Sequence, residues 1–183
     1  MAEALLHPNH GYYKTAKPIG LSGDFITAPE ISQIFGELIG LWMVEMWRIS
    51  GAPKQFGLVE VGPGRGTLMI DALRAMKVVP KFLDAASVHL VETSPVLRTI
   101  QQERLAKYNP TWHESVASLP EIPNFIIANE FFDALPIHQF RFTNAGWREV
   151  LVDFVKGNLV LVLSPGPSPY SALISNEVTL NAK

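Results

Sequence analysis

Cysteine is absent from the 183-residue chain, which excludes disulfides, thiolate metal sites and a cysteine nucleophile and fits a reducing compartment. Clusters of cationic residues are absent as well. The 15 lysines and arginines are outnumbered by 17 acidic residues, and the formal net charge is -2. Because a nucleic-acid surface normally gathers Lys and Arg, we expect no nucleic-acid partner.

Long apolar runs are also missing, and none reaches the roughly 18 residues that a membrane-spanning helix needs. The most apolar helical candidate, residues 31–49, is interrupted by Glu37, Glu45 and Arg48. Residues 1–10 lack the charged start and apolar core of a signal peptide. They resemble the last turns of a helix that begins abruptly, so we expect the chain to be a fragment of a longer protein. With 48% hydrophobic and 17% charged residues, the chain should still bury a sizeable core.

Residues 1–55 are predicted to form an N-terminal cap, an irregular loop and one long helix. Thr27 and Glu30 have the spacing of a capping box at the start of that helix. Gly36 and Gly40 lie four residues apart, so a neighbouring element could approach that side closely. Apolar residues recur at helical spacing and predict a core-facing stripe: Ile31, Ile34, Phe35, Leu38, Ile39 and Trp42.

Strands alternate with helices over residues 56–136, which predicts a parallel sheet with helices on both faces. Strands are expected near 56–61, 88–91, 111–113 and 124–128, the last buried on both faces, and helices over 67–76 and 95–108. Three further strands within 137–163 are separated by hairpin turn signals and predict an antiparallel meander. Residues 164–183 are expected to form a loop or tail.

A glycine loop at a strand-to-helix junction carries the strongest signal of a ligand. Its glycines are Gly62, Gly64 and Gly66. A phosphate-binding P-loop is excluded, because no Lys-Ser/Thr pair follows the last glycine. The dinucleotide fingerprint has two residues between its second and third glycines, whereas this loop has only Arg65. The spacing G-x-G-x-G, preceded by the acid Glu60, is typical of enzymes that use S-adenosylmethionine.

Acidic residues near this loop strengthen the same prediction. Glu92 follows the second strand, where a carboxylate can accept hydrogen bonds from both ribose hydroxyls. Glu60 would be favourable beside ammonium and sulfonium charges and repulsive beside a pyrophosphate. Ser115, after the third strand, is a weaker candidate for adenine contact. A tight turn and a helix-capping acid remain the alternative interpretation.

The end of the fourth strand provides the catalytic candidates Asn129, Glu130 and Asp133. Ligands of open α/β sheets lie beyond the carboxyl ends of the strands, so this segment should face the transferred methyl group. A pair of carboxylates suits a planar guanidinium, which it can hold by two hydrogen bonds. Alternatively, the acids cap a helix and the phenylalanines between them pack in the core. The histidines suggest no metal site.

Several longer segments resemble the MidA-like methyltransferases: residues 11–13, 23–37, 61–68 and 129–136. This family includes a mitochondrial protein arginine methyltransferase that is needed to assemble respiratory complex I. The resemblance implies a class I methyltransferase fold, S-adenosylmethionine as cofactor and a protein arginine as substrate. It also places residues 23–32 over the cofactor, which makes Asp24, Thr27 and Pro29 candidate lid residues.

The sequence therefore predicts an α/β protein with a class I methyltransferase Rossmann-like sheet, incomplete at its C-terminal end. The expected location is the bacterial cytoplasm, with the mitochondrial matrix as the alternative. Such an incomplete sheet leaves an apolar edge, so dimerisation or aggregation is expected. Two other functions stay open: a non-catalytic assembly factor that binds S-adenosylmethionine, and a nicotinamide-dependent oxidoreductase, which the glycine spacing disfavours.

Overall fold

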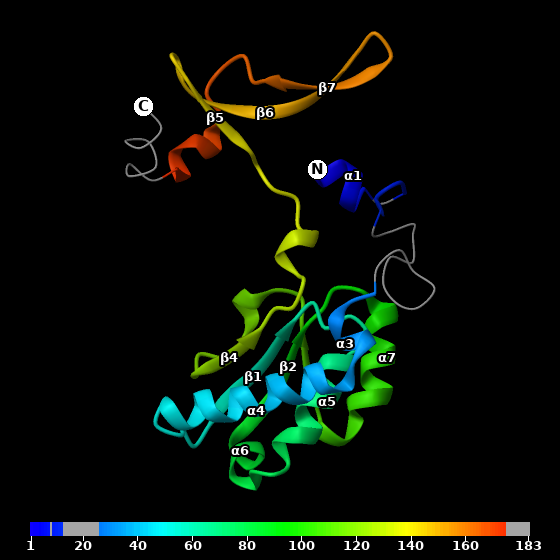
Figure 1. The fold of residues 1–183 in the computed structure, drawn as a ribbon, viewed down its shortest axis with the longest axis vertical. Helices are drawn as coiled ribbons and strands as arrows, with labels where there is room; N and C mark the ends of the chain where they lie inside the picture. Colours follow the sequence, from blue (N-terminus) through cyan, green and yellow to red (C-terminus); the bar gives the residue numbers. More distant parts are fainter. Residues whose placement is uncertain (8, 13–25, 175–183) are drawn as a thin grey trace. The chain divides into compact units, whose positions relative to one another are not determined.

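The computed structural model describes residues 1–7, 9–12 and 26–174, and the chain divides into two compact units (Figure 1). The core unit comprises Glu3–Leu135, and the meander unit comprises Pro136–Lys183 together with Met1–Ala2. No helix in the described part of the chain is long and apolar enough to cross a membrane.

A parallel four-stranded sheet forms the centre of the core unit. Its strands are β1 (Phe56–Val61), β2 (Ala86–Val91), β3 (Thr111–His113) and β4 (Asn124–Ile127). They lie in the order β3-β2-β1-β4 and all run parallel, so their carboxyl ends meet at one edge. The predicted α/β class and parallel sheet are confirmed, and β1, the central strand, is buried at every position.

Helices of the core unit pack around this sheet in Figure 1. They are α3 (Ala28–Ile31), α4 (Gln33–Ile49), α5 (Thr67–Met76), α6 (Pro80–Ala85) and α7 (Pro95–Leu105). A further short helix, α1, spans Ala2–Leu6 near the start of the chain. The predicted start of α7 is confirmed: Ser94 is its N-cap, and the Ser94 hydroxyl accepts a hydrogen bond from the backbone N–H of Leu97. Helix α6 was not predicted.

The long helix α4 turns to the core a face that only partly matches the one predicted. Its glycine face packs on α5, where a Cβ at Gly40 would lie only 2.6 Å from the carbonyl oxygen of Ala72 and one at Gly36 would lie 2.7 Å from the Cβ of Asp71. Three members of the predicted stripe that lie on α4 are 57–62% exposed, namely Ile34, Leu38 and Trp42, whereas Phe35 and Ile39 pack against the core as predicted. The predicted close approach at Gly36 and Gly40 is confirmed, but the stripe is only partly right, because helical spacing does not say which of two apolar or small faces packs.

Two other details differ from the sequence prediction. Thr27 is the N-cap of the short helix α3, but its side chain makes no capping hydrogen bond, and the extended backbone of Ser32 separates α3 from α4. The predicted capping box is therefore wrong, and the Glu30 side chain accepts a hydrogen bond from Thr67 instead. Strand β4 is not buried on both faces: it is an edge strand of the described sheet, and Ile126 is 52% exposed.

The meander unit consists of three antiparallel strands, as predicted. They are β5 (Phe140–Thr143), β6 (Gly146–Val155) and β7 (Asn158–Leu163), paired in sequence order. The turn between β6 and β7 uses Lys156 and Gly157, both with positive φ. The following segment is not all loop, because Pro169–Leu173 forms a 3-10 helix.

Candidate functional site

The glycine loop joins the end of β1 to the start of α5. Gly62, Gly64 and Gly66 all have positive φ, at 67°, 52° and 74°, a region that other residues adopt only with strain. Gly62 also lacks room for a side chain, because an added Cβ would lie 2.4 Å from the ring of Phe131. The loop therefore packs directly against the segment that follows β4.

A buried glutamine holds the loop from the side of α7. The Gln101 side-chain amide donates a hydrogen bond to the carbonyl oxygen of Gly64 at 2.7 Å, and its oxygen accepts one from the Trp112 indole at 2.8 Å. Gln101 is fully buried, so both bonds are shielded from water. The loop is consequently fixed before any ligand arrives.

A cavity of about 60 Å³ lies over the loop, formed by residues of the core unit. Its lining combines the segment before α4, the end of β1, the loop and the segment after β4. The lining residues are Thr27, Pro29, Glu30, Glu60, Gly62, Pro63, Gly64, Arg65, Thr67, Leu68, Asn129 and Glu130. Seven of the residues predicted from the sequence are thus brought together: Thr27, Pro29, Glu60, Gly62, Gly64, Asn129 and Glu130.

Glu60 is the buried acid of this cavity. Its side chain is on the β1 face shared with Phe56 and Leu58, only 3% exposed, and its Oε2 atom has no hydrogen-bond partner among the residues that the structure describes. Burial raises the pKa of the Glu60 carboxyl to about 8, which a hydrogen bond from the backbone amide of Met69 partly opposes. A buried carboxyl group with an unpartnered oxygen, beside a glycine loop, is suited to a cationic ligand, because a nearby positive charge favours the ionised carboxylate.

Glu130 lines the cavity in an unusual backbone conformation. Its φ is 47°, in the left-handed region, where a residue with a Cβ costs about 1 kcal/mol. Such strain is concentrated at functional sites. Asp133 is exposed in the 3-10 helix Phe132–Ala134 and is not part of the lining.

The remaining predicted residues lie outside the cavity lining. Glu92 follows β2, and its carboxylate accepts a hydrogen bond from the backbone N–H of Ser94 at 2.8 Å, at the start of α7. Ser115 caps a short 3-10 helix by accepting from the amide of Ala117. Gly66 is the N-cap of α5. Asp24 lies outside the described residues.

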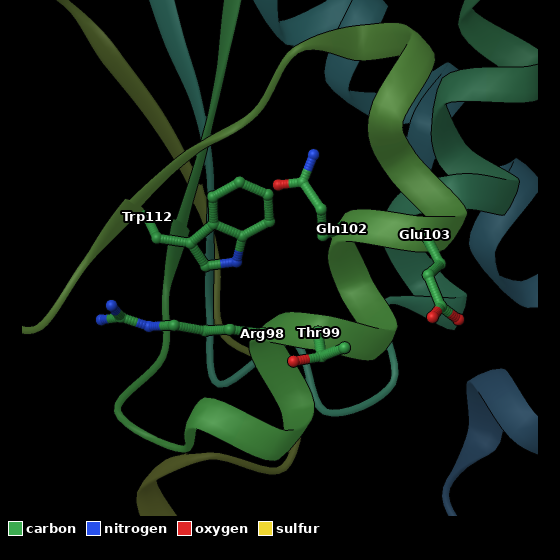
Figure 2. Close-up of a pocket in the computed structure, with 5 residues that line it drawn as sticks. All are labelled: Arg98, Thr99, Gln102, Glu103 and Trp112. Carbon is green, nitrogen blue, oxygen red and sulfur yellow. The ribbon is translucent and has the colours of Figure 1, made fainter.

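A larger depression of about 360 Å³ lies on the other side of α7, against the edge strand β3 (Figure 2). In this view the Gln102 side chain extends toward the ring of Trp112, whereas Glu103 extends away from it. Arg98 is already engaged, because its guanidinium donates to the carbonyl oxygens of Glu92 and His113 at 2.7 and 3.2 Å. The depression contains none of the predicted site residues. No cluster of metal-binding side chains occurs within residues 1–7, 9–12 and 26–174.

Sequence reasoning missed Glu30, Arg65 and Thr67 as cavity residues. Glu30 could have been proposed as a cavity residue, because it is an acid within residues 23–37, which resemble the family. It was assigned to a capping box instead. Its true partner, Thr67, is 37 residues away, a distance that local spacing cannot reveal.

Comparison with known proteins identifies a family that matches this chain. Residues 38–183 match the family described as "Putative S-adenosyl-L-methionine-dependent methyltransferase". The chain belongs to this family. The resemblance to MidA-like methyltransferases is thereby confirmed, and the cofactor of the family is the one that the glycine spacing predicted.

Curated relatives of this methyltransferase family carry more specific names. The protein arginine methyltransferase NDUFAF7, mitochondrial, of Xenopus tropicalis is 43% identical over 195 residues, which cover 92% of this chain and 45% of the relative. The human protein of the same name is 40% identical over 206 residues, covering 98% of this chain and 47% of the relative. The chain thus spans about half the length of the curated relatives it matches.

A solved structure supports the class I methyltransferase fold. A protein from Burkholderia thailandensis, crystallised with S-adenosyl-homocysteine, superposes with a TM-score of 0.69 at 26% identity. The match covers 94% of this chain and 46% of the bacterial one.

Proposed function

We propose that this chain binds S-adenosylmethionine at the glycine-loop cavity and contributes to methyl transfer onto a protein arginine side chain. The single observation that carries the proposal is that Asn129 and Glu130 line the same cavity as the glycine loop and Glu60. Side chains suited to a cationic acceptor and a loop suited to the cofactor therefore share one space. The arginine substrate is supported by the names of the curated relatives.

The described residues suit the cofactor in charge and in the close approach that the glycine loop allows. When bound, S-adenosylmethionine supplies a methyl group activated by its positively charged sulfur. The unpartnered Oε2 atom of Glu60 offers a buried acceptor for the cationic end of such a ligand. The positive φ values of Gly62 and Gly64 let the backbone approach a ligand closely. Glu92, at the end of β2, is proposed to hold the ribose.

Glu130 is proposed to hold and orient the acceptor. A carboxylate can bind a guanidinium by two parallel hydrogen bonds, which fixes the plane of the group and directs one nitrogen toward the methyl donor. Asn129 offers an amide acceptor beside it. Methyl transfer is an in-line displacement, so orientation and electrostatics are the contributions that side chains can make. Asp133, which is not part of the lining, is the weaker candidate for this role.

The same relatives support proposals for the location and the partners of this chain. Their names favour a mitochondrial setting, and we propose the matrix over the bacterial cytoplasm. The proposed partner is a substrate protein, and a role in assembling respiratory complex I remains a prediction, as do self-association and the absence of a nucleic-acid partner.

The experiment has two arms. Isothermal calorimetry of the 183-residue chain with S-adenosylmethionine, S-adenosyl-homocysteine and NAD tests the cofactor, and tritium transfer from labelled S-adenosylmethionine to arginine-containing protein tests the activity. The transfer assay uses a full-length protein containing this chain, beside its Glu130→Gln variant.

We expect both adenosyl compounds to bind, NAD not to bind, and transfer to depend on Glu130. Binding of NAD alone would overturn the cofactor assignment. Binding of the adenosyl compounds without transfer to any lysate protein would favour the non-catalytic assembly factor.

A further inference from the structure

Glu30 connects two parts of the cavity wall that are far apart in the sequence. It belongs to α3, next to the lining residues Thr27 and Pro29. Its Oε1 atom accepts a hydrogen bond from the hydroxyl of Thr67 at 2.6 Å, and its Oε2 atom lies 3.7 Å from the guanidinium of Arg65. Both carboxylate oxygens therefore contact the glycine loop or the first residue of α5.

The contact is strengthened from the other side by α7. Arg104 donates one hydrogen bond to the hydroxyl of Thr67 at 2.8 Å and another to the carbonyl oxygen of Arg65 at 2.9 Å. The Thr67 hydroxyl thus accepts from a cation while it donates to an anion, and such an arrangement polarises both bonds. The Glu30 carboxylate also lies beside the positive end of the α5 dipole.

Burial makes this network more than a surface ion pair. The Glu30 side chain is only 14% exposed, whereas Arg65 is 47% exposed. An exposed pair between Arg and Glu contributes little, but a partly buried carboxylate needs its hydrogen bonds to remain in place. Losing the bond from Thr67 would remove the hydrogen bond that joins α3 to the start of α5.

We propose that Glu30 is a positioning residue that fastens the wall formed by Thr27 and Pro29 to the glycine loop, and that it thereby sets how long the cofactor stays bound. This inference rests on the proposed function, since it requires cofactor binding at the loop. Glu30 acts through Thr67 and Arg65, not as the group that recognises the cofactor. Among variants of one binding site, differences in affinity lie mostly in the dissociation rate, so we expect the effect there.

The test measures dissociation of S-adenosyl-homocysteine from the 183-residue chain in a chase experiment. Glu30→Gln removes the charge and preserves the shape, and Thr67→Val removes the hydroxyl and preserves the volume. Glu37→Gln is the matched control, because Glu37 also links α4 to α5 through Arg74, at 3.5 Å, but is not part of the cavity lining. Thr67→Ser is the conservative variant that restores the hydroxyl.

Glu30→Gln and Thr67→Val should each speed dissociation at least about fivefold. Their combination should add little to either single change, because both break the same contact. Thr67→Ser should return the rate toward that of the parent, and Glu37→Gln should leave it unchanged. Amide hydrogen exchange of residues 26–32 without ligand should be faster in Glu30→Gln and unaltered in Glu37→Gln.

Three results would contradict the inference in distinguishable ways. A parent that does not bind S-adenosyl-homocysteine would overturn the proposed function and the role of Glu30 together. A parent that binds normally, with Glu30→Gln and Thr67→Val at the parental dissociation rate and unaltered exchange, would overturn the role of Glu30 alone. Independent, multiplicative effects of the two substitutions would also contradict a shared contact.

Discussion

The side-chain amide of Gln101 is bonded to the carbonyl oxygen of Gly64, the middle glycine of the loop, although the two residues are 37 positions apart. Replacement by leucine would leave that carbonyl and the Trp112 indole N–H without their partner in a buried site. We expect Gln101→Leu to lower the free energy of unfolding by about 1–3 kcal/mol per unsatisfied group and to weaken cofactor binding. Urea denaturation and calorimetry measure the two effects. Gln102→Leu, on the neighbouring exposed position, is the control.

The raised pKa of Glu60 predicts a specific pH dependence of the free energy of unfolding. Because its pKa is about 8 in the folded chain and 4.5 ordinarily, the folded state holds this proton more tightly than the unfolded state does. The resulting stabilisation is fully present below about pH 4.5 and is lost as the pH rises through about 8. Urea denaturation without ligand, from about pH 5 to about pH 8.5, should show the parent losing stability relative to Glu60→Gln. A constant difference between the two proteins would mean that the carboxyl titrates alike when folded and unfolded.

Glu92 can be tested without disturbing the helix that it caps. Glu92→Gln retains a side-chain oxygen for the backbone N–H of Ser94 but loses the charge proposed to hold the ribose. We expect affinity for S-adenosylmethionine to fall about tenfold, equivalent to about 1.4 kcal/mol, with an unchanged melting temperature. Calorimetry and a thermal melt check both statements. If affinity survives and the melting temperature drops, Glu92 is only a capping residue.

Substitution of Glu130 should lower activity without lowering the stability of the fold. Glu130→Gly removes the carboxylate and also the cost of a side chain at positive φ, so stability should hold or rise by up to about 1 kcal/mol. Transfer to an arginine-containing substrate by a full-length protein should fall at least about tenfold. Ala52→Gly is the matched control: Ala52 has φ 49° and is absent from the cavity lining, so transfer should not change. A marked loss of stability in Glu130→Gly would instead indicate a packing role for the side chain.

The parts of the fold that the sequence predicted are those set by short-range pattern. Turns and caps depend on adjacent residues. The sequence therefore predicted the glycine loop at a strand-to-helix junction, with Gly62, Gly64 and Gly66, and the helix start at Ser94 before α7. The close approach at Gly36 and Gly40 was predicted from the sequence, but the exposure of Ile34, Leu38 and Trp42 on the same helix was not. Which face packs depends on the shape of the partner helix.

The same distinction applies to the candidate site. Asn129 and Glu130 were predicted because the carboxyl ends of parallel strands meet at one edge of the sheet, a rule that requires only the order of strands. The contacts of Glu30 with Thr67 and of Gln101 with Gly64 each join residues 37 positions apart. Such pairs depend on how helices are placed over the sheet, which single-chain periodicity does not specify.

The packing of Phe131 against Gly62 has an evolutionary consequence. The ring occupies the space that any side chain at position 62 would need, 2.4 Å from where its Cβ would lie. A larger residue at 62 would require a smaller one at 131 in addition to a strained backbone, so we expect the effects of substitutions at the two positions to depend on each other. The loop proposed to bind the cofactor and the segment proposed to hold the acceptor are therefore coupled, and changes at this strand end would have to keep residue 131 compatible with Gly62.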